Sequence, residues 1–276
     1  MVFLLPWLGA VIAGTTDSVA PITLRPRATA AEVDWILEAV APYLAVPASR
    51  ADVTSTWAGI RPLAADPSAD PAGTENILRD HVVVDEGDGM VTVTGGKWTT
   101  YRLMAEHAVD AAILAADKAD AGTGGGGAAG AGAEDRLAAR ATPCRTPTVA
   151  VVGAHGYKPE LAARLAQQRY RGAVRAGADR GGGGAGEASS SSSDGGGEAA
   201  VARHLARAYG DRAAAVAALA AAGDGTLARR LAPDHPVIAA EVVYAARHEY
   251  CQTPADFLAR RSRLAFLDVR AAEAGA

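Results

Sequence analysis

Two stretches rich in glycine, alanine and serine, residues 121–135 and 177–198, limit what this chain of 276 residues can fold into. Neither holds enough large apolar side chains to join a core, so we interpret both as solvated linker or insertion sequence. The core must therefore come from the segments outside them. The length allows one large domain or two ordinary ones.

The segment before the first stretch contains two predicted hairpins. Residues 2–5 and 10–14 are short apolar runs on either side of a tight Pro6–Gly9 connection, which predicts paired strands. Residues 81–96 repeat the pattern, with Asp88-Gly89 placed in the turn. Residues 52–63 are predicted to form a further strand that ends at Arg61-Pro62.

Helical signals lie between and after these strands. Thr29 precedes Glu32 by three positions, a capping-box pattern that predicts a helix over residues 30–44, closed by Pro47. From Thr99 onward, apolar residues recur at helical spacing, which predicts a helix with one buried stripe. That stripe consists of Tyr101, Met104, Ala105, Ala108, Val109, Ala112 and Ile113.

The chain after residue 157 is predicted to be helical throughout, apart from the second low-complexity stretch. The expected helices cover residues 158–172, 199–209, 211–222, 237–250 and 254–267. The last begins at Thr253-Pro254, a cap followed by proline at the first helical position. The fold class is therefore α+β: a mixed part over 1–116, a low-complexity linker over 117–142, and a helical part over 143–276 with the insertion at 177–198.

The turn Gly95-Gly96-Lys97 joins a predicted strand to a predicted helix. The first N–H groups of a helix lack partners within it, and with the helix dipole they favour negative charge. Glycines let a ligand approach the backbone, and Lys97 adds a positive charge. Lysine is rare in this chain, in which arginine supplies most of the basic residues. The alternative is an ordinary tight turn with a solvated lysine, and local physics leaves both interpretations open.

Composition excludes several classes of protein. The formal net charge of −4 argues against a general nucleic-acid binder. The two cysteines, Cys144 and Cys251, form no C-x-x-C pair, so they indicate neither a zinc site nor a disulfide framework. No apolar run reaches the roughly 18 residues of a membrane span. The apolar start lacks a basic region and contains Pro6, so we expect no signal peptide.

Five separated strings decide between the interpretations of the turn. GGKWTTYRLMAEHAVDAA (95–112) closely resembles the FAD-dependent glycerol-3-phosphate dehydrogenases, and LPWLGAVIAGTTD (5–17), TWAGIRPL (56–63), LRDHVV (78–83) and RRSRLAFLD (260–268) agree in order. The stretch 241–268 is similar to the C-terminal helical domain of the mitochondrial branch. The resemblance implies a partial FAD-dependent oxidoreductase (DAO-type) domain followed by an all-α C-terminal domain.

The resemblance also implies roles for individual residues. Gly95, Gly96, Lys97 and Thr99 are expected to contact the pyrimidine end of the flavin of FAD. Arg61, Arg79 and Lys97 are expected to bind the substrate phosphate, for which bidentate guanidinium pairing is well suited. Without the family, Arg61 and Arg79 would be interpreted as surface arginines.

Other polar residues near these motifs receive less weight. Thr15, Thr16 and Asp17 are expected to border the same cavity. Arg260, Arg261 and Arg263 are expected to pack the helical part against the catalytic part. His81 and His107 could serve as proton acceptors, but ordinary histidines are common at such positions. We therefore assign no catalytic residue and no metal ligand.

The sequence departs from the family at one point. A dinucleotide-binding flavoprotein needs a strand–G-x-G-x-x-G–helix unit for the pyrophosphate. Here GTGGGGAAG (122–130) has that spacing only within low-complexity sequence, with no strand before it. We therefore expect the chain to be a C-terminal portion of such an enzyme, and expect this portion alone to be inactive.

By resemblance, the full enzyme oxidises sn-glycerol 3-phosphate to dihydroxyacetone phosphate and passes electrons to a quinone. Peripheral association with the mitochondrial inner membrane is expected, and a homo-oligomer is an alternative to a monomer; this chain has no targeting signal of its own. A different class of function is a non-catalytic helical interaction module derived from such an enzyme. A third alternative, a flavoenzyme that oxidises amines or hydroxy acids, is disfavoured because Arg61 and Arg79 suit a phosphorylated substrate.

Overall fold

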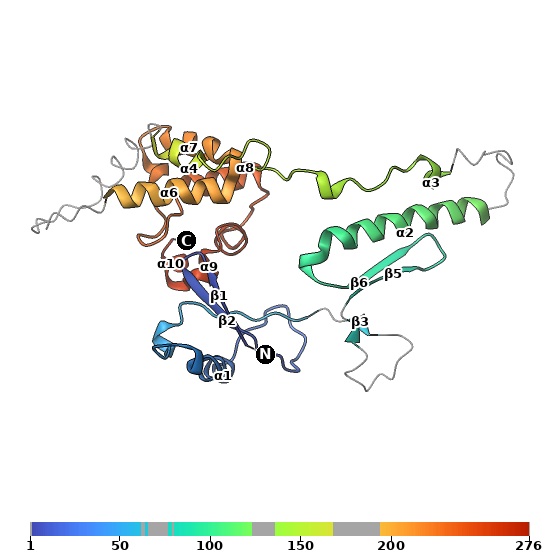
Figure 1. Cartoon of the computed structure of the whole chain (residues 1–276), viewed down its shortest axis with the longest axis horizontal. Coiled ribbons are helices and arrows are strands. Elements are labelled where there is room, and N and C mark those ends of the chain that lie inside the picture. Colours follow the sequence, from blue (N-terminus) through green and yellow to red (C-terminus); the bar gives the residue numbers. More distant parts are fainter. Residues whose placement is uncertain are drawn as a thin grey trace, which may run out of the picture. The chain divides into compact units, whose positions relative to one another are not determined.

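The computed structural model describes residues 2–61, 64–65, 77–78, 80–122, 136–167 and 194–275. Most of the two low-complexity stretches lies outside the described residues, but residues 194–198, predicted to belong to the insertion, form the start of a helix over Asp194–Tyr209. The chain divides into two compact units (Figure 1): Met1–Gly59 packs with Ala150–Ala276, and Ile60–Val149 forms the other. The fold class is α+β, as predicted. The domain boundaries near residues 116 and 142 stay a prediction.

The first unit begins with the predicted hairpin, formed by β1 (Phe3–Trp7) and β2 (Ala10–Gly14). The connection is shorter than predicted, because only Leu8 and Gly9 form it, both with positive φ, as in a two-residue hairpin turn. Pro6 lies inside β1 opposite Val11. In this register Trp7 and Ala10, the pair next to the turn, exchange hydrogen bonds, and Pro6 and Val11 form a non-hydrogen-bonded pair. The backbone N–H that proline lacks is therefore not needed at position 6 for pairing with β2.

The predicted first helix is confirmed as α1 (Ala30–Val40), but it ends earlier than residue 44. Its capping box is present: the Thr29 hydroxyl accepts from the Glu32 amide, and the Glu32 carboxylate accepts from the Thr29 amide. The bond from the Thr29 amide, followed by the bonds from the Thr29 and Thr16 hydroxyls, lowers the pKa of Glu32. Pro42, rather than Pro47, accounts for the end, because it has no N–H to continue the helical ladder. The 3₁₀ turns η1 (Ala41–Tyr43) and η2 (Arg50–Asp52) follow.

The strand predicted over 52–63 is wrong for the described residues 53–61, which are extended but not paired in a sheet. Their polar groups bond to helical residues near the chain's end instead. The Thr54 carbonyl accepts from the Val269 amide at 3.1 Å, and the Ser55 hydroxyl donates to the Ala265 carbonyl at 2.8 Å. The Trp57 ring packs edge-on against Phe266, with centroids 5.2 Å apart. The local sequence indicated an extended segment, but it did not indicate which residues this segment bonds to.

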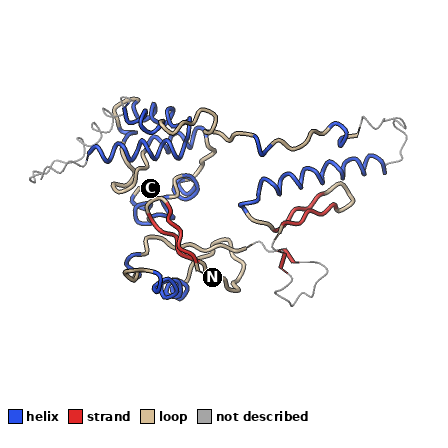
Figure 2. The backbone as a smooth tube through the Cα atoms, in the orientation of Figure 1, coloured by secondary structure: helices blue, strands red, loops and turns tan. Residues whose placement is uncertain are grey.

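The core of the first unit lies in the helical part, whose helices are blue in Figure 2. Helix α6 is the longest of these helices and packs against α4 and α7. The largest fully buried side chains include Leu205, Ile238 and Leu264. The elements are α4 (Leu161–Gln167), α6 (Asp194–Tyr209), η7 (Gly210–Arg212), α7 (Ala213–Ala221), η8 (Thr226–Ala228), α8 (Ala239–His248), η9 (Asp256–Arg261), α9 (Leu264–Leu267) and α10 (Val269–Ala274).

The predicted continuous helix over 254–267 is broken in the structure. It starts as the π-helical η9, and Arg263 then adopts a left-handed conformation with φ 61° before α9 begins. The buried Ser262 hydroxyl donates to the Phe257 carbonyl and accepts from the Leu264 amide, so it satisfies backbone groups at the break. Helical periodicity alone does not reveal such a side-chain bond.

The start of η9 supplies a test by pH. The Asp256 carboxylate accepts from the Gln252 amide and from both the amide and hydroxyl of Thr253. The Thr253 bonds, from its side chain first, lower the pKa of Asp256. A carboxyl with a lowered folded-state pKa stabilises the fold above its unfolded pKa, and this contribution is lost as pH falls through the folded pKa. We therefore expect Asp256→Asn to lose less stability than wild type between pH 7 and pH 3, measured by urea midpoints. An equal loss in both proteins would contradict this.

The second unit is built around a hairpin and a long helix (Figures 1 and 2). The predicted hairpin is confirmed: β5 (His81–Asp85) pairs antiparallel with β6 (Val91–Gly95). Side chains close its loop, since Asp85 accepts from the Gly87 amide and Asp88 from the Met90 amide. The remaining elements are β3 (Ala64–Ala65), β4 (Ile77–Leu78), η4 (Trp98–Thr100), α2 (Tyr101–Gly122), α3 (Leu137–Arg140) and η6 (Thr146–Thr148).

Helix α2 packs against β5 and β6, but its predicted stripe is only partly covered. Met104, Ala108 and Ile113 are half-buried, whereas Tyr101 and Val109 are more than half exposed. The hairpin covers one side of the helix, so a stripe defined by spacing alone is wider than the contact. In the described residues, no helix of the chain has the length and apolar character needed to cross a membrane.

Candidate functional site

The Gly95-Gly96-Lys97 turn leads from β6 into η4 and α2, as the sequence predicted. Gly95 and Gly96 have φ angles of 74° and 77°, a conformation that other residues rarely adopt. Lys97 returns to extended backbone, and its carbonyl accepts from both the amide and the hydroxyl of Thr100 at 3.0 Å. The two glycines are thus required by the path of the chain itself.

The inner side of the turn is tightly packed. A Cβ atom on Gly96 would lie 2.7 Å from the Met104 sulfur and 2.9 Å from the His81 Cβ. The missing side chain therefore makes room for neighbours beneath the turn. The sequence suggested glycine because it lets a ligand approach the turn from outside. The structure adds a second reason for glycine at position 96, which is the packing of Met104 and His81 against it.

The outer side of the turn is open to solvent. Lys97 and Thr99 are exposed, and Trp98 is 86% exposed, stacked on Tyr101 with ring centroids 5.3 Å apart. The amides of Trp98 and Thr99 stand at the head of the helical segment, where no preceding helical carbonyl faces them. An exposed ammonium, a hydroxyl and helix-leading amides together suit a planar ligand edge that carries negative charge.

This donor set fits one end of FAD. A reduced flavin carries its negative charge on the pyrimidine part of the ring, which accepts hydrogen bonds and pairs with a cation. Lys97, Thr99 and the turn amides are the groups that would hold it. The turn is not the strand–G-x-G-x-x-G–helix unit that binds a pyrophosphate, so the fit concerns the ring end of the cofactor.

The two arginines expected at the substrate phosphate are placed unequally. Arg61 is exposed and lies in the same compact unit as the turn. Arg79 lies outside the described residues. The structure brings together the turn, β5 and α2, and it leaves the roles of Arg61 and Arg79 as predictions.

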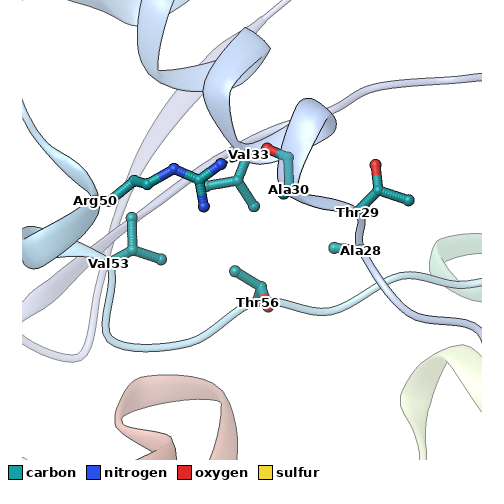
Figure 3. Close-up of a pocket in the computed structure, with 7 residues that line it drawn as sticks. All are labelled: Ala28, Thr29, Ala30, Val33, Arg50, Val53 and Thr56. Carbon is teal, nitrogen blue, oxygen red and sulfur yellow. Dashed lines mark hydrogen bonds between the residues drawn. The ribbon is translucent and has the colours of Figure 1, made fainter.

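Residues 15–17 were expected to border the site, and one of them, Thr16, has a structural role. The Thr16 hydroxyl donates to the Glu32 carboxylate at 3.0 Å, so it joins the cap of α1. A hollow of about 330 Å³ lies beside this cap (Figure 3), lined by residues that include Thr29, Arg50 and Thr56. Arg50 is bound there by Asp34 and the Ala30 carbonyl. We assign no ligand to this hollow.

The arginines of RRSRLAFLD differ from one another. Arg260 pairs with Asp256 of its own segment, and Arg260 and Arg263 line a shallow hollow with Trp7 and Trp57. Arg261 lies inside the helical part: it donates to Glu249 and to the Ala208 carbonyl, and its guanidinium lies 4.0 Å from the Tyr209 ring centroid. Arg260 and Arg263 thus border one hollow together with residues of the N-terminal part, whereas Arg261 contacts groups within the helical part.

Sequence reasoning missed a buried polar cluster beside Arg261. Glu241 is 1% exposed; its carboxylate accepts from the Ile238 amide at 2.8 Å and lies 2.9 Å from His204 Nε2. The Tyr209 hydroxyl is buried with no hydrogen-bond partner within the described residues. Burial, and then the Glu241 charge, raise the pKa of Tyr209. The only signal in the sequence was a glutamate on an otherwise apolar helix face.

The structure also joins two histidines that the sequence left unassigned. His81 Nε2 lies 2.8 Å from His107 Nδ1, and His81 Nδ1 lies 2.8 Å from Asp80 Oδ1. The bonds from the His81 amide and then its ring lower the pKa of Asp80. This cluster lies directly beneath the glycine turn, since His81 pairs with Gly95 in the sheet.

Comparison with known proteins finds similarity over nearly the whole chain. Residues 1–102 match the model of the FAD dependent oxidoreductase family, and residues 144–276 match the C-terminal domain of alpha-glycerophosphate oxidase. Among curated relatives, the mitochondrial glycerol-3-phosphate dehydrogenase SDP6 of Arabidopsis thaliana is 44% identical over 99% of the chain and 38% of its own length. The mitochondrial glycerol-3-phosphate dehydrogenases of Mus musculus and Schizosaccharomyces pombe are 36% and 33% identical over 99% of the chain, and 31% and 40% of their own lengths.

The chain thus spans at most two-fifths of the length of these relatives. The matched segments follow the order of the mixed and helical parts. The chain thus carries part of an FAD dependent oxidoreductase domain followed by the C-terminal domain of alpha-glycerophosphate oxidase, and it is similar to the mitochondrial glycerol-3-phosphate dehydrogenases over nearly its whole length.

Proposed function

We propose that this chain serves the FAD-dependent oxidation of sn-glycerol 3-phosphate to dihydroxyacetone phosphate, with electrons passed to a quinone. The observation that carries the proposal is the similarity to mitochondrial glycerol-3-phosphate dehydrogenases over 99% of the chain. The glycine-lysine turn supports it, because its exposed groups suit a negatively charged ring edge. FAD, when bound, supplies the acceptor for the hydride from C2 of the substrate.

The residues of this chain bind and orient in this proposal. Gly95 and Gly96 form the turn, and Lys97 and Thr99 contact the flavin ring edge. Arg61, Arg79 and Lys97 bind the substrate phosphate, where the guanidinium fork matches two phosphate oxygens. The energy of phosphate binding helps to hold C2 against the flavin, so loss of a phosphate contact affects both binding and turnover.

Location and partners belong to the same proposal. The relatives are named mitochondrial, and we propose a peripheral position at the inner membrane, where a quinone is accessible. Assembly into a homo-oligomer is compatible with this arrangement. A nucleic-acid partner is not expected for a chain with a net charge of −4. The predicted division into 1–116, 117–142 and 143–276 is part of the same hypothesis.

A chimera tests the proposal. Residues 1–276 replace the matching segment of the Arabidopsis relative, and oxidation of glycerol 3-phosphate is followed with a quinone analogue. We expect an active chimera in which Arg61→Ala lowers kcat/KM by about 10- to 100-fold, because a charge-assisted hydrogen bond contributes about 1.5–3 kcal/mol. Arg61→Lys should recover part of this loss, since lysine keeps the charge but lacks the fork.

Arg25→Ala, at an exposed position outside the matched motifs, provides the control and should leave kcat/KM unchanged. Equal kinetics of wild type, Arg61→Ala and Arg61→Lys would return Arg61 to the surface-arginine interpretation. An inactive chimera that is folded and binds FAD would count against the proposed reaction.

The second candidate function is a non-catalytic helical interaction module. The buried core around Leu205 and Ile238 favours it, because the helical part has an interior of its own. Flavin absorbance of the purified chain separates the two on binding: a soluble chain that retains flavin and reduces a quinone analogue would exclude the module. We expect residues 1–276 alone to lose FAD and to show no activity, since the turn contacts only the ring end of the cofactor.

A further inference from the structure

Three side chains beneath the glycine turn form a continuous hydrogen-bonded chain. Asp80 Oδ1 lies 2.8 Å from His81 Nδ1, and His81 Nε2 lies 2.8 Å from His107 Nδ1. The two rings are stacked, with centroids 4.9 Å apart and an interplanar angle of 29°. This hydrogen-bonded chain therefore connects the start of β5 to His107 on α2.

The bonding pattern fixes the tautomers. The Asp80 carboxylate can only accept, so His81 carries its proton on Nδ1. In neutral His81, Nε2 is then an acceptor, and His107 must donate from Nδ1. If His81 takes a further proton on Nε2, the direction of the bond reverses and His107 accepts through Nδ1. Two imidazolium rings would both donate and repel each other, so the bond survives one added proton but not two.

The position of His81 makes this proton relevant to the turn. Its side chain is 5% exposed, and its Cβ lies 2.9 Å from where a Cβ on Gly96 would be. His81 is also the cross-strand partner of Gly95. A proton held by the His81 ring therefore adds positive charge to a residue whose Cβ contacts the turn that carries Lys97.

We propose that Asp80, His81 and His107 form a proton-binding relay that positions the Gly95-Gly96-Lys97 turn on α2. One added proton keeps the relay bonded and adds positive charge beneath the turn; a second proton breaks the bond to His107 and frees the turn from the helix. The three are positioning residues, acting through the turn. The proposed function enters only in what the turn contacts, a flavin edge that becomes negatively charged on reduction.

Charged groups of both signs lie beside the two rings. Asp80 contributes a carboxylate from the start of β5, and Glu106 contributes one from α2, next to His107. Arg102 binds Glu106 at 2.6 Å and so offsets part of that second charge. Lys97 follows Gly96 in the turn and opposes protonation at longer range. Asp80, the only carboxylate bonded to a ring of the pair among the described residues, is the strongest of these influences.

The test is a titration of the ligand-free full chain by NMR. Histidine ring nitrogens and the amides of Gly95 and Gly96 are followed against pH. Because the two rings share one hydrogen bond, we expect the pair to bind protons in two separate, coupled steps. The turn amides should follow both steps. His155, exposed and outside the cluster, provides an internal reference.

Two variants separate the relay from simple packing. Asp80→Asn keeps an acceptor for His81 Nδ1 but removes the charge, so the first step should move to lower pH. His107→Gln can donate to neutral His81 or accept from the charged form, so the acidic step of the turn amides should disappear while the hairpin stays folded. Circular dichroism confirms folding in both cases.

Independent titration of the two rings with one common midpoint would overturn the relay, as would an unchanged amide profile in His107→Gln. Because the chain carries no flavin in this titration, the result does not depend on the proposed reaction. An inactive chimera would count against that reaction and leave the relay intact.

Discussion

Glu241→Ala is expected to lower the free energy of unfolding of the helical part by about 2–4 kcal/mol, because a buried donor left without its acceptor costs about 1–3 kcal/mol and the lost side-chain volume adds to this. Glu241 begins α8 by accepting from the Ile238 amide, and its second oxygen bonds His204 of α6. Alanine would leave the Ile238 amide and the His204 ring without this acceptor and would open a cavity between two helices. Each of these effects destabilises the fold.

Urea unfolding of the full chain, followed by circular dichroism, measures the change. Glu241→Gln keeps an oxygen for the Ile238 amide but not the charge, so its loss should be smaller. Glu273→Gln is the matched control, because Glu273 is exposed on α10 of the same unit, and it should change stability by less than about 0.5 kcal/mol. If Glu241→Ala and Glu273→Gln unfold alike, the buried pair does not stabilise the helices.

The fold was predictable where local chemistry determines it. The Thr29 capping box and the hairpin over 81–96 depend on residues a few positions apart, and the structure confirms both. The strand predicted at 52–63 failed because its backbone bonds to residues near 265 and 269, which no local pattern specifies. The prediction of a continuous helix through Arg263 failed for a related reason. A buried serine bonds to the backbone there and redirects it within a helical repeat.

The position of the turn was predictable from the sequence, but the contacts around it were not. The string GGKWTTYR located the turn, and the φ angles of Gly95 and Gly96 explain its glycines. The relay from Asp80 to His107 was out of reach because its members are 27 positions apart and meet only when β5 packs on α2. Glu241 was missed because a glutamate within a helical repeat ordinarily faces solvent.

Gly96→Ala is expected to destabilise the second unit by about 2–5 kcal/mol, the sum of two effects. A side chain at φ 77° adds about 1–2 kcal/mol of backbone strain. The new Cβ would also lie 2.7 Å from the Met104 sulfur and 2.9 Å from the His81 Cβ, and overpacking of this kind costs about 1–3 kcal/mol. Met104 can move in part, because its side chain is flexible, but the Cβ of His81 is fixed by the strand.

Gly87→Ala separates the two effects. Gly87 has φ 84° in the loop of the same hairpin, and a Cβ there would meet nothing within 4 Å. It should therefore show the backbone strain alone, so the difference between the variants measures the contact with Met104 and His81. Hydrogen exchange of the α2 and β6 amides is the readout, because opening of this unit exposes both. Protection factors that fall equally in the two variants would mean that strain alone requires glycine at position 96, and that the turn does not press on His81.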